Sequence, residues 1–371
     1  MKPKAVALAA LLALGTPGCI FANGSGTSGE TSGGTTTDAD IKQYESLRTQ
    51  LEAHRKPFLP VGASELQGVA TRVFWEQFPT DSPDLYSYEP SSDTRTKYDF
   101  SIGVSDDANF RASEDLVVTA ENTGDHIVYH TYAAGAANQS LGDLETDPTG
   151  DDVKWWAYAP DHGDLYYVVT GDDTALWKWT PKAGGDATRL FSLEELGLEP
   201  GEFEDFGVDS GVMVFIEGGR IWSLDLATKK PVWLGNKTEA SGAAWDQQGV
   251  LFSTADGPFF YDYSKGSLRD LAAEIQGSSY KLNTTYASAH LYSDDLTRKG
   301  SLFGYKGSSG VFTYDLDGGA VTPILLDARD LSTYYRYPVI LDEGSFFVVG
   351  LESNDGAIGA DGQTYTLDYQ L

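Results

Sequence analysis

From about residue 66 to the C-terminus, short runs of apolar, β-branched and aromatic residues alternate with turns rich in Gly, Asp, Ser and Asn. Apolar runs of this kind between turn residues are typical of β-strands. Residues 221–233, IWSLDLATKKPVW, predict two such strands around a polar turn. Helical periodicity fades after residue 66, so the pattern predicts an all-β domain.

One five-residue pattern recurs in this domain: an aliphatic residue or Thr, an aromatic residue, any residue, then Tyr, Trp or Leu, then Asp, Thr or Glu. Its copies begin at positions 85, 176, 221, 311 and 364, with looser copies at 127 and 258. Around position 221 the repeating unit contains four strands and three turns. Four antiparallel strands in every 40 to 50 residues predict a single β-propeller over residues 61–371. We expect seven blades, with six or eight as alternatives, and we expect Trp222, Leu224 and Trp233 to pack between blades.

The last copy of the pattern, TYTLDYQL, ends the chain. The seventh blade therefore lacks a fourth strand of its own, and an open strand edge invites aggregation. We expect an N-terminal strand from about residues 61–78 to close the ring.

The N-terminal residues resemble an export signal. Lys2 and Lys4 precede an apolar run from Ala5 to Leu14, and Cys19 follows Gly18. The run is too short to span a bilayer. The arrangement resembles a bacterial lipoprotein signal, which implies a signal peptide over residues 1–18 and acylation of Cys19. Cleavage after residue 22 as an ordinary signal peptide is the alternative.

Residues 19–37 combine the Cys with a Gly/Ser/Thr-rich segment that cannot pack, so we expect a flexible tether. Residues 38–60 predict an amphipathic helix, because Ile41, Tyr44, Leu47 and Leu51 recur at helical spacing. It either packs on the main domain or binds a partner. By resemblance, Ile at position 20 favours the outer membrane, on its periplasmic or its outer side. Membrane attachment is then only through the lipid.

The third repeat unit resembles the repeats of TolB-type propellers. Residues 160–163, Pro-Asp-His-Gly, stand at the first turn of this unit, and Gly184-Gly185 stand at a later one. The stretch around position 221 is similar to quinoprotein propeller repeats, with Lys229 where that family usually has Gly. TolB-type domains are envelope proteins that act through protein contacts, so the resemblance implies a binding role.

The formal net charge is -29, and residues 61–371 contain 50 acidic and 20 basic residues. Such a surface should repel nucleic acid and anionic lipid, and attract cations or a basic partner. Solubility, or adaptation to a saline habitat, would explain the same charge.

Propeller topology predicts where the acidic residues gather. Loops joining strands 2 to 3 and strands 4 to 1 emerge on one face, which we call the acidic face. The candidate binding residues on this face are Asp81, Asp84, Asp125, Asp172, Asp173, Asp256, Asp355, Asp361, Glu202, Glu204 and Asp205. The junctions of strands 3 and 4, with bases such as Lys97, Lys229 and Lys230, are expected on the opposite, less acidic face.

Catalytic and cofactor motifs are not recognisable. The five His are scattered, no Ser lies in a Gly-x-Ser-x-Gly context, and no phosphate-binding Gly-rich pattern occurs within residues 61–371. Asp-rich segments 143–152 and 351–363 offer oxygen ligands suited to Ca²⁺ but do not match the twelve-residue calcium loop. The sequence favours a monomeric binding module without a cofactor. The alternative is a propeller hydrolase, lactonase or lyase with a carboxylate- or metal-lined central channel.

Overall fold

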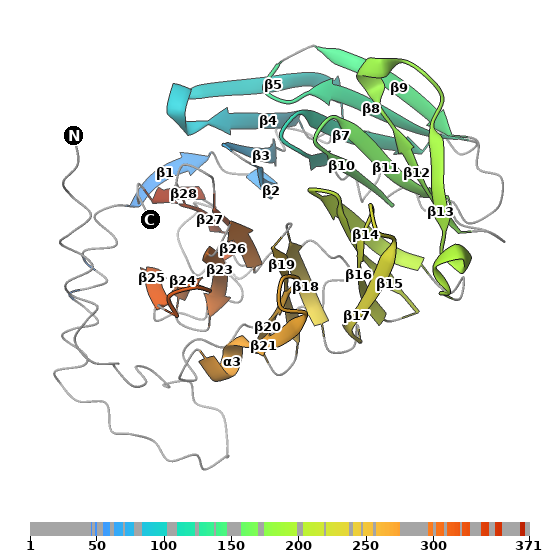
Figure 1. The fold of residues 1–371 in the computed structure, drawn as a ribbon. Coiled ribbons are helices and arrows are strands. Elements are labelled where there is room, and N and C mark those ends of the chain that lie inside the picture. The colour runs from blue at the N-terminus through green and yellow to red at the C-terminus, as the bar shows by residue number, and fades with distance from the viewer. Residues whose placement is uncertain are drawn as a thin grey trace, which may run out of the picture.

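The structure is a computed structural model, and it describes part of the chain. The described residues are Ser46, Thr49, 55–59, 63–69, 71–77, 84–101, 110–122, 126–136, 139–146, 157–169, 174–198, 203–218, 220–236, 240–245, 248–254, 257–274, 296–299, 302–307, 310–319, 321–326, 335–340, 346–350 and 364–367. They form seven four-stranded antiparallel sheets arranged as blades around a centre (Figure 1).

The first four blades follow one another along the chain. Blade 1 contains β2 (Ala63–Val69), β3 (Arg72–Gln77), β4 (Asp84–Glu89) and β5 (Thr94–Ser101), with the 3-10 helix η1 (Pro90–Ser92) between the last two. Blade 2 contains β6 (Phe110–Ala112), β7 (Leu116–Asn122), β8 (Ile127–Ala133) and β9 (Ser140–Thr146). Blade 3 contains β10 (Tyr158–Asp161), β11 (Asp164–Val169), β12 (Ala175–Trp179) and β13 (Thr188–Ser192), with η2 (Pro181–Ala183) and η3 (Glu194–Leu196). Blade 4 contains β14 (Phe203–Asp209), β15 (Val212–Glu217), β16 (Arg220–Asp225) and β17 (Lys230–Asn236).

The remaining three blades complete the ring. Blade 5 contains β18 (Ala240–Trp245), β19 (Gly249–Thr254), β20 (Gly257–Asp262) and β21 (Ser267–Asp270), followed by the short helix α3 (Leu271–Glu274). Blade 6 contains β22 (Leu296–Lys299), β23 (Leu302–Gly307), β24 (Gly310–Asp315) and β25 (Val321–Leu326). Blade 7 contains β26 (Tyr335–Ile340), β27 (Phe346–Gly350) and β28 (Thr364–Leu367). Among the described residues, no helix is long and apolar enough to cross a membrane.

An N-terminal strand closes the ring, as expected, but it is not the predicted one. Strand β1 (Arg55–Leu59) pairs antiparallel with β28 and supplies the fourth strand of blade 7, whereas residues 63–77 form the first two strands of blade 1. The predicted boundary between helix and propeller at residue 60 is therefore wrong. Pro57 cannot continue a helix, and the open edge of β28 offers hydrogen bonds to an extended segment. Ser46 and Thr49 are helical, and the rest of residues 38–54 lies outside the described residues.

The repeated five-residue pattern marks the third strand of every blade. Its seven copies fall on β4, β8, β12, β16, β20, β24 and β28. The first strand of each blade lies innermost, and first strands of neighbouring blades contact each other. A shared hydrophobic core joins blades 4 and 5. The all-β propeller prediction is confirmed, and its seven blades agree with the seven described sheets.

The acidic residue that ends the pattern has a structural role in three blades. Asp225 Oδ1 accepts hydrogen bonds from the backbone N–H groups of Ala227 and Thr228, at 2.8 and 2.9 Å. Asp262 and Asp315 make the same kind of turn at the ends of β20 and β24. Such side-chain bonds stabilise the turn between strands 3 and 4. The turns then need a left-handed residue four positions after the Asp: Lys229, Gly266 and Gly319, with φ of 55°, 58° and 68°.

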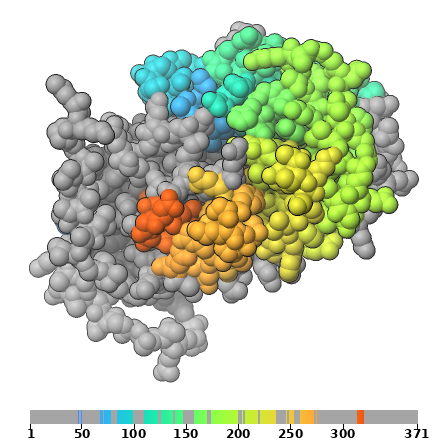
Figure 2. Space-filling model, viewed as in Figure 1, coloured from blue at the N-terminus to red at the C-terminus, as the bar shows by residue number. Residues whose placement is uncertain are grey.

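Large apolar side chains fill the interfaces between blades, and blades 1 to 5 form one continuous body in the space-filling view (Figure 2). Leu224 is fully buried, and Trp222 packs against the core between blades 3 and 4. The prediction for Trp233 is wrong, since its side chain is 57% exposed. Trp233 pairs with Trp222 but lies on the outermost strand, where less of the neighbouring blade covers it.

Candidate functional site

The turns between strands 1 and 2 link neighbouring blades. Asp161, at the end of β10, accepts hydrogen bonds from the backbone N–H groups of Ser210 and Gly211 in the next blade, both at 3.0 Å. The Asp161 residue is 7% exposed. The preceding blade contributes Ser113 Oγ, which donates to the carbonyl of His162 at 2.6 Å. The Pro-Asp-His-Gly motif is thus a connection between blades, and its carboxylate is already occupied.

A buried arginine lies among the inner strands of blades 2 to 4. Arg111, on β6, is 5% exposed; its guanidinium donates to the Phe206 carbonyl at 3.3 Å and lies 5.5 Å from the Tyr158 ring centre. The enzyme alternative requires carboxylates or His around the central channel. Among the described inner strands, β6 contributes a cation, the Arg111 guanidinium. In the described part of the chain, no group of three or more His, Cys, Asp or Glu is arranged to hold a metal ion.

Most of the predicted acidic face lies outside the described residues, namely Asp81, Asp125, Asp172, Asp173, Asp256, Asp355, Asp361 and Glu202. Glu204 and Asp205 belong to the inner strand β14, so their assignment to the preceding loop is wrong. Strand β14 begins at Phe203 and includes both acids, because a bulge between Phe203 and Asp205 lets Phe203 pair with Glu217.

Of the residues predicted for the acidic face, Asp84 is the one whose side chain the structure describes. It begins β4 and accepts a hydrogen bond from Lys97 Nζ at 2.7 Å. This hydrogen bond raises the pKa of the Lys97 ammonium. Lys97 was expected on the opposite face, and that expectation is wrong: Lys97 lies along β5 opposite Tyr86, within reach of Asp84. The charge of Asp84 is therefore paired within its own blade.

Blade 2 brings together five ionisable side chains, Glu121, His126, His130, Asp143 and Glu145, which we call the acid–histidine cluster. His130 bridges two strands, since its Nε2 lies 3.2 Å from Glu121 Oε2 and its Nδ1 lies 3.1 Å from Asp143 Oδ1. His126 Nε2 lies 3.6 Å from Glu145 Oε1. Asp143 and Glu145, at the start of the Asp-rich segment 143–152, lie on β9.

The cluster is open to solvent and rich in negative charge. The side chains of its three acids are 55–64% exposed, and their ion pairs among the described residues are all with the two His. With neutral imidazoles the cluster carries three negative charges. A carboxylate only accepts hydrogen bonds, so a cation or a basic side chain is the group that such a surface attracts.

Sequence reasoning missed the two His because it treated all five as scattered. His126 immediately precedes β8, and His130 lies on that strand four residues later. Side chains two or four apart on a strand point to the same face, so this spacing was a usable signal. The predicted Asp125 directly precedes His126 in the sequence and lies outside the described residues.

Comparisons with known proteins find similar structures but no similar sequences. No protein-family model and no curated protein sequence matches the chain. A chain in a crystal structure of the mitotic checkpoint complex matches with a TM-score of 0.50 at 8% identity, covering 93% of this chain and 98% of that one. The fold is a β-propeller.

Two further solved structures are similar to this propeller. A prolyl endopeptidase structure has a TM-score of 0.50 at 12% identity, with 85% of this chain and 52% of that chain covered. AztD from Citrobacter koseri in its apo form has a TM-score of 0.47 at 10% identity, with 72% and 87% covered. At such low identities the similarity concerns the fold alone.

Proposed function

We propose that this propeller is an exported, lipid-anchored binding module of the bacterial cell envelope, and that its acidic face captures a basic protein or other cationic ligand. The acid–histidine cluster carries the proposal. It places three exposed carboxylates on β7 and β9 of blade 2. The resemblance of the third repeat unit to the repeats of TolB-type propellers, which act through protein contacts, is a second argument for a binding role.

The overall charge supports the same class of partner. A formal charge of -29 creates a long-range field that speeds the approach of cations and repels anions. Exposed charges are screened beyond about 8 Å at physiological salt. We therefore expect capture to weaken as salt is added.

A lysine-rich peptide of about ten residues is the probe for this binding, measured by titration calorimetry at low salt. Replacing Glu121, Asp143 and Glu145 by Gln, Asn and Gln removes three charges and should weaken binding about tenfold, equivalent to about 1.4 kcal/mol. The matched control replaces three exposed acids in the turns at the opposite end of the blades, Glu114, Asp115 and Asp317, by their amides. An equal loss in both variants, or no binding by the wild-type protein, would overturn the proposal.

The lipid anchor rests on Cys19 and the preceding apolar run. Expression in a bacterial host with a labelled fatty acid should give labelled protein, and the Cys19→Ser variant should give none. Labelling of the variant, or failure to label the wild-type protein, would refute the anchor without affecting the calorimetric test.

A further inference from the structure

Blade 4 presents an exposed indole on its outermost strand. Trp233, at 57% exposure, is one of two large apolar side chains that the described residues leave exposed; the other is Leu268 on β21. Its Nε1–H donates to the Gly235 carbonyl at 2.9 Å. This bond satisfies the polar edge of the ring and limits its rotation. The indole is thus a preorganised platform whose apolar surface remains open to a ligand.

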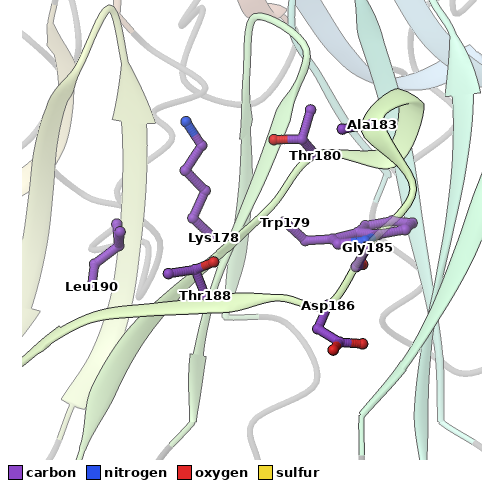
Figure 3. Close-up of a pocket in the computed structure, with 8 residues that line it drawn as sticks. All are labelled: Lys178, Trp179, Thr180, Ala183, Gly185, Asp186, Thr188 and Leu190. Carbon is purple, nitrogen blue, oxygen red and sulfur yellow. The ribbon is translucent and has the colours of Figure 1, made fainter.

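Blade 3 contains a small open pocket. Its volume is about 290 Å³, and β12, β13 and the loop between them form its walls (Figure 3). Lys178 and Thr188 are direct partners in these two strands, so their side chains lie on the same sheet face. Asp186, on the loop, adds an exposed carboxylate. The lining of the pocket therefore includes an ammonium donor, a hydroxyl and a carboxylate acceptor.

Leu190 connects the pocket with blade 4. It is part of the pocket wall, and both Leu190 and Trp222 pack against the core between blades 3 and 4. The Leu190 carbonyl accepts a hydrogen bond from Lys229 Nζ, at 3.2 Å, which crosses from the turn before β17. Trp233 is the cross-strand partner of Trp222 on the same face. The platform and the pocket thus belong to one surface between the two blades.

The chemistry of this surface suits a sugar. Sugar hydroxyls both donate and accept hydrogen bonds, so they match a site that presents donor and acceptor groups together. The C–H face of a pyranose ring is apolar and can cover an indole. We propose that the outer surface between blades 3 and 4 binds a neutral oligosaccharide, with one sugar ring on Trp233 and a neighbouring one in the pocket.

Electrostatics argue against an anionic ligand here. Lys178 is already paired with Asp164 at 2.6 Å, and Asp186 adds a negative charge. Anions are further disfavoured by the net charge of the molecule. The site lies on different blades from the acid–histidine cluster, so the two proposals can fail independently.

The test uses maltohexaose, cellohexaose and mannohexaose as probes, followed by tryptophan fluorescence and calorimetry. We expect at least one to bind wild-type protein with a dissociation constant below about 5 mM. Trp233→Ala should weaken this binding at least tenfold, and Thr188→Ala should weaken it severalfold. Leu268→Ala is the matched control, because it truncates the other exposed apolar side chain, and it should bind as wild type does.

Three results would overturn the proposal. The first is that none of the three hexasaccharides binds the wild-type protein. The second is that Trp233→Ala binds as tightly as Leu268→Ala. The third is that a proline-rich decapeptide, the other neutral ligand that stacks on exposed tryptophan, binds in a Trp233-dependent way while the sugars do not.

Discussion

Replacing Asp161 by Ala should destabilise the ring between blades 3 and 4. The change removes the acceptor of two backbone N–H groups, those of Ser210 and Gly211, at 3.0 Å each. A hydrogen bond to a charged group contributes about 1.5–3 kcal/mol, and less where the donor is partly exposed. For the two bonds together we expect a loss of about 2–4 kcal/mol in the free energy of unfolding. The unfolding entropy of roughly 310 residues is about 0.65 kcal/mol/K, so Tm should fall by about 3–6 °C.

Calorimetric or circular-dichroism melting of purified protein measures this shift. Asp161→Asn keeps one carbonyl acceptor, so its Tm should lie between those of wild type and Asp161→Ala. Asp115→Ala is the control, because it removes an equal charge from the corresponding turn of blade 2, where the residue is exposed. A fall below 1 °C for Asp161→Ala, or a fall as large for the control, would refute the reasoning.

Three further predictions concern single side chains. Lys229 has a φ of 55°, a left-handed conformation that costs a non-Gly residue about 1 kcal/mol. The Lys229→Gly variant should therefore be about 1 kcal/mol more stable than Lys229→Ala in urea unfolding. Equal stability of the two variants would contradict this prediction. Burial raises the pKa of Tyr167 to about 12, above the unfolded value of about 10, so its contribution to stability is full below pH 10 and is lost as pH rises through 12. Absorbance titration of wild type against Tyr167→Phe should show this late ionisation, and ionisation near pH 10 in folded protein would disprove it. Arg269 holds both oxygens of Glu274, at 3.0 and 2.5 Å, and lowers the pKa of that carboxyl. Glu274→Gln should therefore cost about 1 kcal/mol at pH 7, and the difference from wild type should shrink below pH 4; a constant difference across this range would argue against the ion pair.

The repeats of the sequence determined the architecture. The five-residue pattern marks the third strand of all seven blades, because an alternating strand that ends in a tight turn repeats the same local requirements in each blade. In blades 5 and 6 the Asp at its end and the Gly four residues later belong to the same turn, and blade 4 has Lys229 in place of that Gly. Such requirements involve only neighbouring residues, so they can be read from a single sequence. The ring closure was also predictable in kind, because a final blade without a fourth strand leaves an open edge.

Only the tertiary structure decided which side chains remain exposed or become neighbours. Strand β1 was placed by the edge of β28, about 300 residues away along the chain, against the helical pattern around it. Trp222 and Trp233 look alike in the sequence, yet one packs between blades and the other lies on the outermost strand. Asp84 meets Lys97, and His130 meets Glu121 and Asp143, through strand register. The alternation of residues along a strand shows which face of the sheet a side chain occupies. The contacts of that side chain depend on the neighbouring strands and blades, and the local sequence pattern does not specify these.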